Sequence, residues 1–169
     1  NRLQVNLVGE DASFGQVSID SRDLIDGALF VAIEGVHFDG NDFVADAHSR
    51  GAAGALVSRR ASVPLPQLKV TDTRIAFGQM ARAWRENFPI PVVAVTGSNG
   101  KTTVKEMAAA MLGDGTLATH GNFNNDVGVP LTLLRLHAEH RFAVIELGAN
   151  APGEIAWTSS LTRPQVALV

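Results

Sequence analysis

The chain of 169 residues contains no cysteine. Disulfide bonds and metal sites built on thiolates are therefore excluded. The chain also lacks any apolar run near the roughly 20 residues that a membrane-spanning helix needs. Its first residues, NRLQVNLVGEDAS, do not have the charged-then-apolar order of a signal peptide. These absences predict a cytoplasmic protein without a membrane partner.

Blocks of like charge are missing as well. The 14 lysines and arginines and the 17 acidic residues give a net charge of −3 and are mixed along the chain. A basic block would have indicated nucleic-acid binding, so we expect no nucleic-acid partner. The hydrophobic content of 46% is that of a globular protein with a sizeable core.

The last residues, QVALV, form an apolar run that continues to the final position. A strand exposed at the last residue would be a poor natural end, because its unpaired backbone invites pairing with other chains. We therefore expect the sequence to be a piece of a longer protein.

Two prolines in NFPIPVV, residues 87–93, mark the predicted domain boundary. Proline ends a helix and stiffens a connection. Residues 1–88 read as a small α/β domain. Its expected strands are 17–20, 28–35 and 53–58, and its expected helices are 41–51 and 73–87. The apolar positions expected on one side of the second helix are Ile75, Met80, Ala83 and Trp84.

In residues 89–169, strands alternate with helices. The apolar run PVVAV, residues 91–95, has the pattern of a strand covered on both faces. Alternating strands and helices predict a parallel sheet with right-handed crossovers after the small α/β N-terminal domain. The further strands are expected at 116–120, 142–148 and 165–169, and the helices at 101–112, 130–136 and 153–161. The apolar residues at helical spacing in the first of these helices are Val104, Met107, Ala108, Met111 and Leu112.

The stretch AVTGSNGKTT, residues 94–103, joins the end of a strand to the start of a helix. Backbone N–H groups are unpaired there, and the helix dipole adds positive potential, so the connection suits a phosphate group. Lys101 can cover the β- and γ-phosphates of ATP, and the Thr102 hydroxyl can reach Mg²⁺. Val95 stands where the usual phosphate-binding loop has its first glycine. The expected nucleotide-binding residues are Thr96, Gly97, Ser98, Asn99, Gly100, Lys101, Thr102 and Thr103.

One carboxylate, Glu146, ends the otherwise apolar strand in FAVIELGAN. In a parallel sheet this strand end lies on the same edge as the phosphate loop. A carboxylate there can hold Mg²⁺ against nucleotide phosphates. Taken alone, Glu146 could equally be a solvated acid at the end of a strand or a metal ligand. The neighbouring phosphate-binding loop favours the metal ligand.

Polar loops offer further candidates. HGNFNNDVGVP, residues 120–130, contains Asn122, Asn124 and Asn125, but asparagine and glycine also serve ordinary turns. In the first domain, Ser21, Arg22 and His37 lie in loops after expected strands. Composition alone favours turn chemistry and solvated surface residues at these positions.

Several stretches together resemble the Mur ligase family. They are VTGSNGKTT, GNFNNDVGVPLTLL, ELGAN with GEIAW and LTRPQVALV, and upstream DSR, GALFVAIEG and FDGNDF. The forms ELGAN and GNFNNDVGVP favour the member that uses D-Ala-D-Ala over the one that adds the third residue. Folylpolyglutamate synthases share the loop but not the upstream pattern.

The resemblance implies a ligase of peptidoglycan synthesis that uses ATP and Mg²⁺. Its substrates would be UDP-N-acetylmuramoyl-tripeptide and D-Ala-D-Ala, joined through an acyl phosphate. Residues 1–88 would bind the UDP substrate, with Ser21, Arg22 and His37 near the uridine and diphosphate. Residues 89–169 would be the first part of the ATP-binding central domain, a truncated P-loop-type ATPase domain with a parallel sheet. Lys101 would stabilise the migrating phosphoryl group, and Thr102 and Glu146 would hold Mg²⁺. Asn125 would be a catalytic neighbour of the metal, and Asn122 and Asn124 would contact substrate.

The family's central domain continues past this chain, so we expect the 169 residues to be inactive alone. We also expect a monomer. Two alternatives remain at this point. The loop could serve a nucleotide-dependent switch or regulatory NTPase, or the chain could be a non-catalytic module that binds UDP-sugars.

Overall fold

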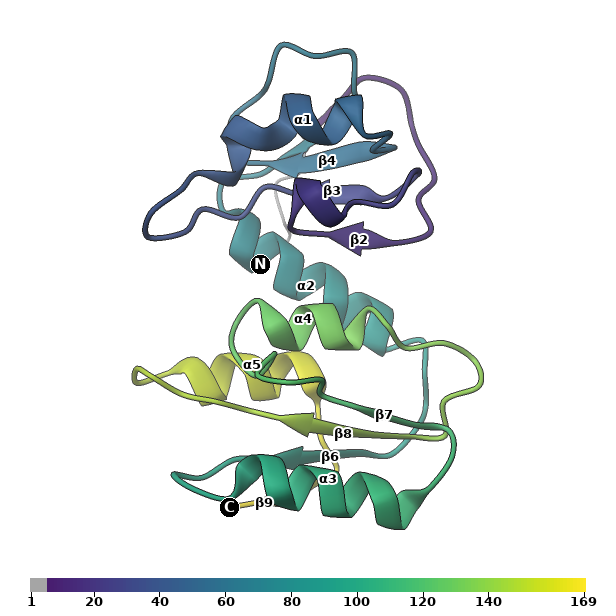
Figure 1. Ribbon diagram of the computed structural model, residues 1–169, viewed down its shortest axis with the longest axis vertical. Coiled ribbons are helices and arrows are strands. Elements are labelled where there is room, and N and C mark those ends of the chain that lie inside the picture. The colour runs from purple at the N-terminus through teal and green to yellow at the C-terminus, as the bar shows by residue number, and fades with distance from the viewer. Residues whose placement is uncertain (1–5) are drawn as a thin grey trace. The chain divides into compact units, whose positions relative to one another are not determined.

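The computed structural model describes residues 6–169, which form two compact α/β units (Figure 1). The units divide between Phe77 and Gly78, inside one helix, whereas the sequence led us to place the boundary at Pro89. Core packing explains why the units divide before Pro89 in the chain. Ala81 and Phe88 both pack in the core of the second unit, so the end of the helix belongs with that unit.

The first unit contains a five-stranded sheet in the order β1-β5-β4-β3-β2. Strand β1 is antiparallel to β5, and the other neighbours are parallel. The strands are β1 Asn6–Val8, β2 Val17–Ser18, β3 Leu29–Val31, β4 Gly54–Val57 and β5 Gln67–Lys69. Three of them were predicted. The sequence did not lead us to predict β1 and β5; β5 directly follows Pro64 and Pro66, and proline is disfavoured in the interior of a sheet.

The helices of the first unit follow the predicted positions. The stretch predicted as one helix, 41–51, is a 3₁₀ turn, η2 Gly40–Phe43, followed by α1 Val44–Ser49. A second 3₁₀ turn, η1 Ser21–Asp23, carries two of the candidate residues. The core gathers apolar side chains of β3, α1 and β4: Phe30, Ala32, Val44, Ala47, Ala55 and Val57.

Helix α2, Thr73–Arg85, begins where the sequence predicts, and the Asp72 carboxylate accepts the N–H of Ile75 as a cap. The apolar residues that the spacing groups on one side of the helix do not form its buried side. Ile75 and Trp84 are 40% and 42% exposed, while Phe77 is fully buried. The correct stripe includes small and polar residues, which hydrophobicity alone does not pick out. Its buried positions are Thr73, Ala76, Phe77, Gly78, Ala81 and Arg85.

The second unit contains a four-stranded parallel sheet in the order β7-β8-β6-β9. All four strands were predicted. β6 pairs with β8 along its whole length, and the last pair joins Val95 to Glu146. Both strands therefore end at the same edge of the sheet. The strands are β6 Val92–Val95, β7 Thr116–Ala118, β8 Phe142–Glu146 and β9 Val166–Leu168.

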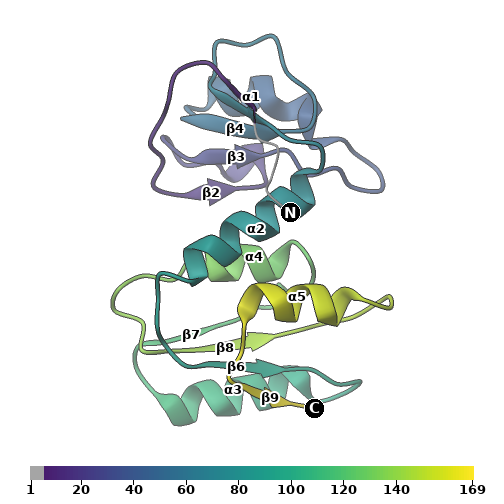
Figure 2. The same cartoon turned by 180° about the vertical axis from the view of Figure 1, so that it is seen from behind.

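Helix α3, Lys101–Leu112, lies on one face of this sheet, and α4, Gly128–Leu133, and α5, Glu154–Thr162, lie on the other (Figure 1 and Figure 2). The core on the α4 and α5 side includes Val129, Leu133, Leu136 and Leu161. Within residues 6–169, no helix is long and apolar enough to cross a membrane.

The apolar positions of α3 are not its buried side. Val104, Met107 and Met111 are 39%, 60% and 85% exposed, while the Lys105 side chain is only 1% exposed. Helical spacing identified a stripe of apolar residues but not which side of the helix meets the sheet. A lysine occupies the contact with the sheet instead.

Candidate functional site

The connection between β6 and α3 forms a loop at the carboxyl edge of the second sheet. Gly97 and Gly100 have φ values of +125° and +77°, which side-chain-bearing residues rarely adopt. An added Cβ at Gly100 would meet no heavy atom within 4 Å. Glycine is therefore required there by the backbone conformation, which turns the chain into the first residue of α3.

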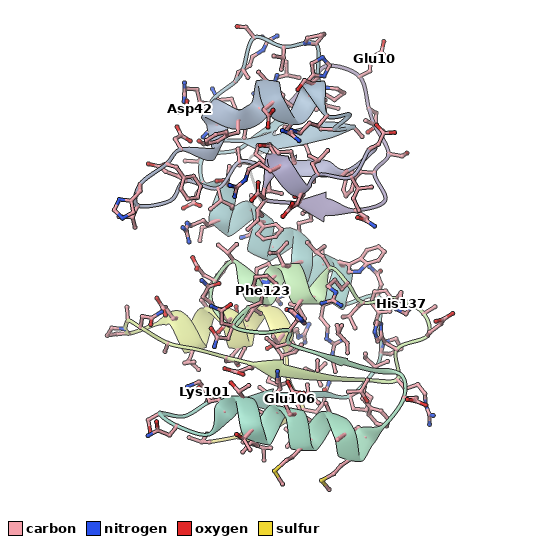
Figure 3. The ribbon with its side chains drawn as sticks, in the orientation of Figure 1. Glu10, Asp42, Lys101, Glu106, Phe123 and His137 are labelled. Atoms are coloured by element: carbon pink, nitrogen blue, oxygen red, sulfur yellow. The ribbon has the colours of Figure 1, made fainter. Side chains whose placement is uncertain are left out.

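The loop presents unpaired donors. Within the described part of the chain, the backbone N–H groups of residues 97–100 donate no hydrogen bond. Lys101 follows them, and its Nζ donates to the Gly97 carbonyl over 2.8 Å, so its charge lies over the loop. Figure 3 shows Lys101 at the N-terminal end of α3. Free amides, a helix N-terminus and a folded-back ammonium group suit an anion such as a nucleotide phosphate.

The Glu146 carboxylate lies beside this loop, as the sequence predicts. The Thr102 hydroxyl donates to its Oε2 over 3.0 Å, and the Asn124 side-chain amide donates to its Oε1 over 2.8 Å. Glu146 is only 2% exposed. The solvated-acid alternative is therefore excluded, because this carboxylate is buried and held by two donors from α3 and from the loop before α4.

Two residues near Glu146 were missed by the sequence reasoning. The Glu146 N–H donates to the Thr119 hydroxyl over 2.9 Å, and the Lys105 Nζ donates to the Thr119 carbonyl over 2.7 Å. Thr119 follows β7, at the same edge of the sheet. Its place at the end of an apolar stretch was the only available signal. Lys105 looked like an ordinary polar position of a surface helix.

The other predicted loop residues are placed differently. The Asn125 side chain accepts the N–H groups of Val127 and Gly128, so it caps the start of α4. Asn122 is exposed. Of the three asparagines, the structure brings Asn124 to the Glu146 carboxylate, and it shows a local structural role for Asn125.

The oxygen donors around Glu146 suit a magnesium ion that is also bound by phosphates. Among residues 6–169, no group of three or more histidines and acids could hold a metal ion by itself. Mg²⁺ that bridges nucleotide phosphates needs only one or two protein oxygens, since phosphates and waters complete its octahedron. The Glu146 carboxylate and the Thr102 hydroxyl provide such a pair, so these residues fit the ion.

A second candidate site lies wholly within the first unit. A cavity of about 470 Å³ is lined by η1 and its neighbours, including Ser21 and Arg22, and by the aromatic rings of Phe30, Phe38 and Phe43. The predicted His37 is exposed and does not line the cavity. The structure thus brings two of the three predicted residues together around an apolar floor.

The two carboxylates that line this cavity, Asp20 and Asp46, each accept hydrogen bonds from neighbouring side chains. The Arg22 guanidinium donates to both carboxylate oxygens of Asp20. These side-chain bonds, followed by a bond from the Arg22 backbone N–H, lower the pKa of Asp20 to about 2. A hydrogen bond from Ser21, followed by one from Arg50, lowers the pKa of Asp46. Both carboxylates are therefore ionised at neutral pH, and Arg22 keeps an exposed side chain at the rim.

Comparisons with known proteins agree with the motifs. Residues 13–111 match the model of the Mur ligase family, catalytic domain, and residues 95–169 match that of the Mur ligase middle domain. The UDP-N-acetylmuramoyl-tripeptide--D-alanyl-D-alanine ligase of Escherichia coli (strain K12) is 56% identical over 169 residues, covering 99% of this chain and 37% of the relative. The ligase of the same name from Bacillus subtilis (strain 168) is 41% identical over 160 residues, covering 90% and 35%. The chain thus spans just over a third of the length of these relatives.

Solved structures show the same fold. UDP-N-acetylmuramoylalanyl-D-glutamyl-2,6-diaminopimelate--D-alanyl-D-alanyl ligase from Acinetobacter baumannii matches with a TM-score of 0.87 and 46% identity, over 91% of this chain and 35% of that one. The MurF ligase from Thermotoga maritima, solved in complex with ADP, matches with a TM-score of 0.80 and 32% identity, over 88% and 35%.

Proposed function

Because this chain belongs to the Mur ligase family, we propose that it supplies the acceptor-binding unit and the phosphate site of an ATP-dependent ligase of peptidoglycan precursor synthesis. The proposed reaction joins D-Ala-D-Ala to UDP-N-acetylmuramoyl-tripeptide. The names of the relatives support this choice of substrates. The ADP complex of the Thermotoga maritima relative supports an adenine nucleotide as a ligand, and the unpaired amides of residues 97–100 support the loop as its site.

The observation that carries the proposal is the buried Glu146 carboxylate bonded to Thr102, beside the loop at residues 97–100. This is the arrangement that phosphoryl transfer needs, because the protein's main task there is to align the phosphates and neutralise their charge. A carboxylate does not react readily with an amine, since its leaving group would be an oxide ion. Transfer of the γ-phosphoryl group to the tripeptide carboxylate creates an acyl phosphate, and attack by the amine of D-Ala-D-Ala then forms the amide and releases phosphate.

Each candidate site residue of the second unit has a proposed role in that transfer. Lys101 leaves the Gly97 carbonyl and contacts the migrating phosphoryl group, while the loop amides hold the remaining phosphates. Glu146 and Thr102 would hold a magnesium ion, which would supply positive charge to offset that of the phosphate oxygens. Asn124 orients Glu146 through its side-chain amide. Asn125 acts through the α4 cap rather than by touching the metal, and Asn122 faces substrate.

The cavity of the first unit is the proposed site of the UDP portion. Its aromatic floor suits the uracil base, and Arg22 at the rim suits the diphosphate. His37 lies one residue from Phe38, which lines the cavity, and reaches the ligand only if its loop moves.

The remaining expectations also belong to this proposal. The family's central domain continues beyond these 169 residues, so the chain alone is expected to bind its ligands without joining the two substrates. A cytoplasmic monomer without a nucleic-acid partner remains our prediction.

The test is phosphate release by the full-length protein that contains these 169 residues, given ATP, UDP-N-acetylmuramoyl-tripeptide, D-Ala-D-Ala or their combinations. Release that requires all three supports the ligase. Release with ATP alone would support a switch or regulatory NTPase, and binding of UDP-substrate without any release would support a non-catalytic module. Lys101→Ala should lower kcat by at least about 100-fold. Lys69→Ala, at an exposed lysine of β5, is the control and should leave the rate unchanged.

A further inference from the structure

A buried lysine on α3 is not used by the proposed reaction. The side chain of Lys105 is 1% exposed, and its Nζ has two oxygen neighbours, the Thr119 carbonyl at 2.7 Å and Glu106 Oε1 at 2.6 Å. The Glu106 side chain is 66% exposed and adjoins Lys105 in sequence, as Figure 3 shows for its position on α3. Burying an ammonium group is costly even when it is paired. A methionine of similar length would fill the space without that cost, so what the lysine adds is the directed bond to Thr119.

Thr119 connects this bond to the metal-binding carboxylate. Its hydroxyl accepts the N–H of Glu146 over 2.9 Å, and its own N–H donates to the Val144 carbonyl over 3.1 Å. Thr119 is 1% exposed, so these bonds are shielded from water. The residue thus anchors the end of β8 where the Glu146 side chain leaves the strand.

Two residues of α3 are connected to Glu146, one through its carboxylate and the other, by way of Thr119, through its backbone. From α3, Thr102 contacts its carboxylate, and Lys105, three positions later on the helix, contacts Thr119, which holds its backbone. Residues three apart lie on one face of a helix, so both contacts come from the same side of α3. The position of Glu146 relative to the helix that carries the phosphate loop is therefore set at its backbone and at its carboxylate.

We propose that Lys105 and Thr119 are positioning residues for the magnesium-nucleotide site, acting through the backbone of Glu146. The proposal rests on the proposed function only for the identity of the ligand. Neither residue touches substrate. Their effect is to keep the Glu146 carboxylate within reach of Thr102, so losing either one weakens the use of Mg²⁺ more than the binding of the UDP substrate. Loss of such outer partners commonly costs about 10- to 100-fold in metal affinity or activity.

The variants are chosen to keep side-chain volume. Lys105→Met removes the bond to the Thr119 carbonyl, and Thr119→Val removes the hydroxyl that accepts from Glu146. Thr119→Ser restores a hydroxyl. Thr158→Val is the matched control, because Thr158 is a fully buried threonine of the same unit whose hydroxyl donates to the Glu154 carbonyl of its own helix. Melting curves from circular dichroism set a temperature at which every variant used is folded.

The first readout is the dissociation constant of ADP with and without Mg²⁺. We expect Lys105→Met and Thr119→Val to reduce the tightening caused by Mg²⁺ by about 10-fold or more. Thr119→Ser and Thr158→Val should keep it. The second readout is hydrogen exchange at the Glu146 amide without metal, which should speed up in Thr119→Val and not in Thr158→Val.

Unchanged Mg²⁺ dependence in Lys105→Met and Thr119→Val, with lowered melting temperatures alone, would overturn the proposal and leave these residues a packing role. If Lys105→Met does not fold, the comparison of Thr119→Val with Thr119→Ser still decides. ADP binding does not depend on the ligation reaction. A full-length protein, containing these 169 residues, that binds Mg²⁺ and ADP but joins no amide would refute the proposed function while leaving this inference standing.

Discussion

The Thr102 hydroxyl lies 3.0 Å from Glu146 Oε2, although the two residues are 44 positions apart in the chain. Thr102 stands in the first turn of α3, and Glu146 is the last residue of β8. The contact joins the helix that follows the phosphate loop to the neighbouring strand. It brings a hydroxyl and a buried carboxylate to the edge of the sheet where the loop amides are unpaired.

Removing the charge of Glu146 tests its role with the metal. Glu146→Gln keeps the shape of the side chain but provides a weaker ligand for Mg²⁺. We expect kcat to fall by about 100-fold and the half-saturating Mg²⁺ concentration to rise, as measured by phosphate release across a Mg²⁺ titration. Glu139→Gln, at an exposed acid of the same unit, should behave as the parent. Parent-like Mg²⁺ dependence in Glu146→Gln would mean that another group holds the ion.

Gly148 leaves room for Asn124. A Cβ added at Gly148 would lie 2.8 Å from Asn124 Oδ1, closer than real Cβ atoms approach. Gly148→Ala should therefore displace the side chain that donates to Glu146 Oε1. We expect the Mg²⁺-dependent affinity for ADP to fall by about 10-fold. Gly15→Ala, where an added Cβ meets no heavy atom within 4 Å, is the control, and equal affinities in the two variants would contradict this reading.

The pair of Asp20 and Arg22 predicts a pH dependence. The folded-state pKa of Asp20 is lowered from 3.8 to about 2, first by the Arg22 side chain. A lowered folded-state pKa stabilises the fold above the unfolded value of 3.8, and this contribution is lost as the pH falls through about 2. Between pH 4 and pH 2, the unfolding free energy of the parent should therefore fall more steeply than that of Asp20→Asn in urea titrations.

The cause of the shift can be checked directly by NMR titration of the Asp20 carboxyl carbon. Arg22→Ala should raise the pKa of Asp20 toward 3.8, although the bond from the residue-22 backbone N–H remains. Arg60→Ala, at an exposed arginine of the same unit, should not move it. A pKa that stays at about 2 in Arg22→Ala would assign the shift to the backbone bond.

Arg85 stabilises the second unit through backbone carbonyls. It is 6% exposed, and its guanidinium donates to the carbonyls of Thr162, Phe88 and Ile90. Burial lowers the pKa of this group. Arg85→Ala leaves these carbonyls without their donor, so we expect a loss of about 2 to 4 kcal/mol in the free energy of unfolding, measured with urea. Arg82→Ala, which removes an exposed pair with Glu86, should cost less than about 1 kcal/mol. Similar costs for the two variants would refute a special role for Arg85.

The alternating pattern of the second unit was predictable because its central strands, β6 and β8, are largely apolar runs, and because glycine or proline marks most of the connections. The first unit was less predictable. β5 follows Pro64 and Pro66, and β1 is only three residues long, so their place in the sheet depends on pairing with each other and with β4. The residues of a short segment do not by themselves predict which strand it will pair with.

The same division holds for the candidate site. Lys101, Thr102 and Glu146 could be named because a loop motif and a lone acid at a strand end are visible in the chain. Asn124 could not be separated from Asn125, since the two are neighbours of equal chemistry. Only the fold of their loop directs one to Glu146 and the other to the start of α4.

The sequence by itself determined the order of strands and helices in the second unit, the glycines that the loop requires and the residue types that can meet a phosphate and a metal ion. These depend on local conformation and on side-chain chemistry, which neighbouring residues in the chain specify. The tertiary structure alone decided which side of α2 and α3 is buried, and that Lys105 and Thr119 hold the backbone of Glu146. Those outcomes depend on which surfaces pack together across long separations in the chain, and packing follows from the shape of the whole unit.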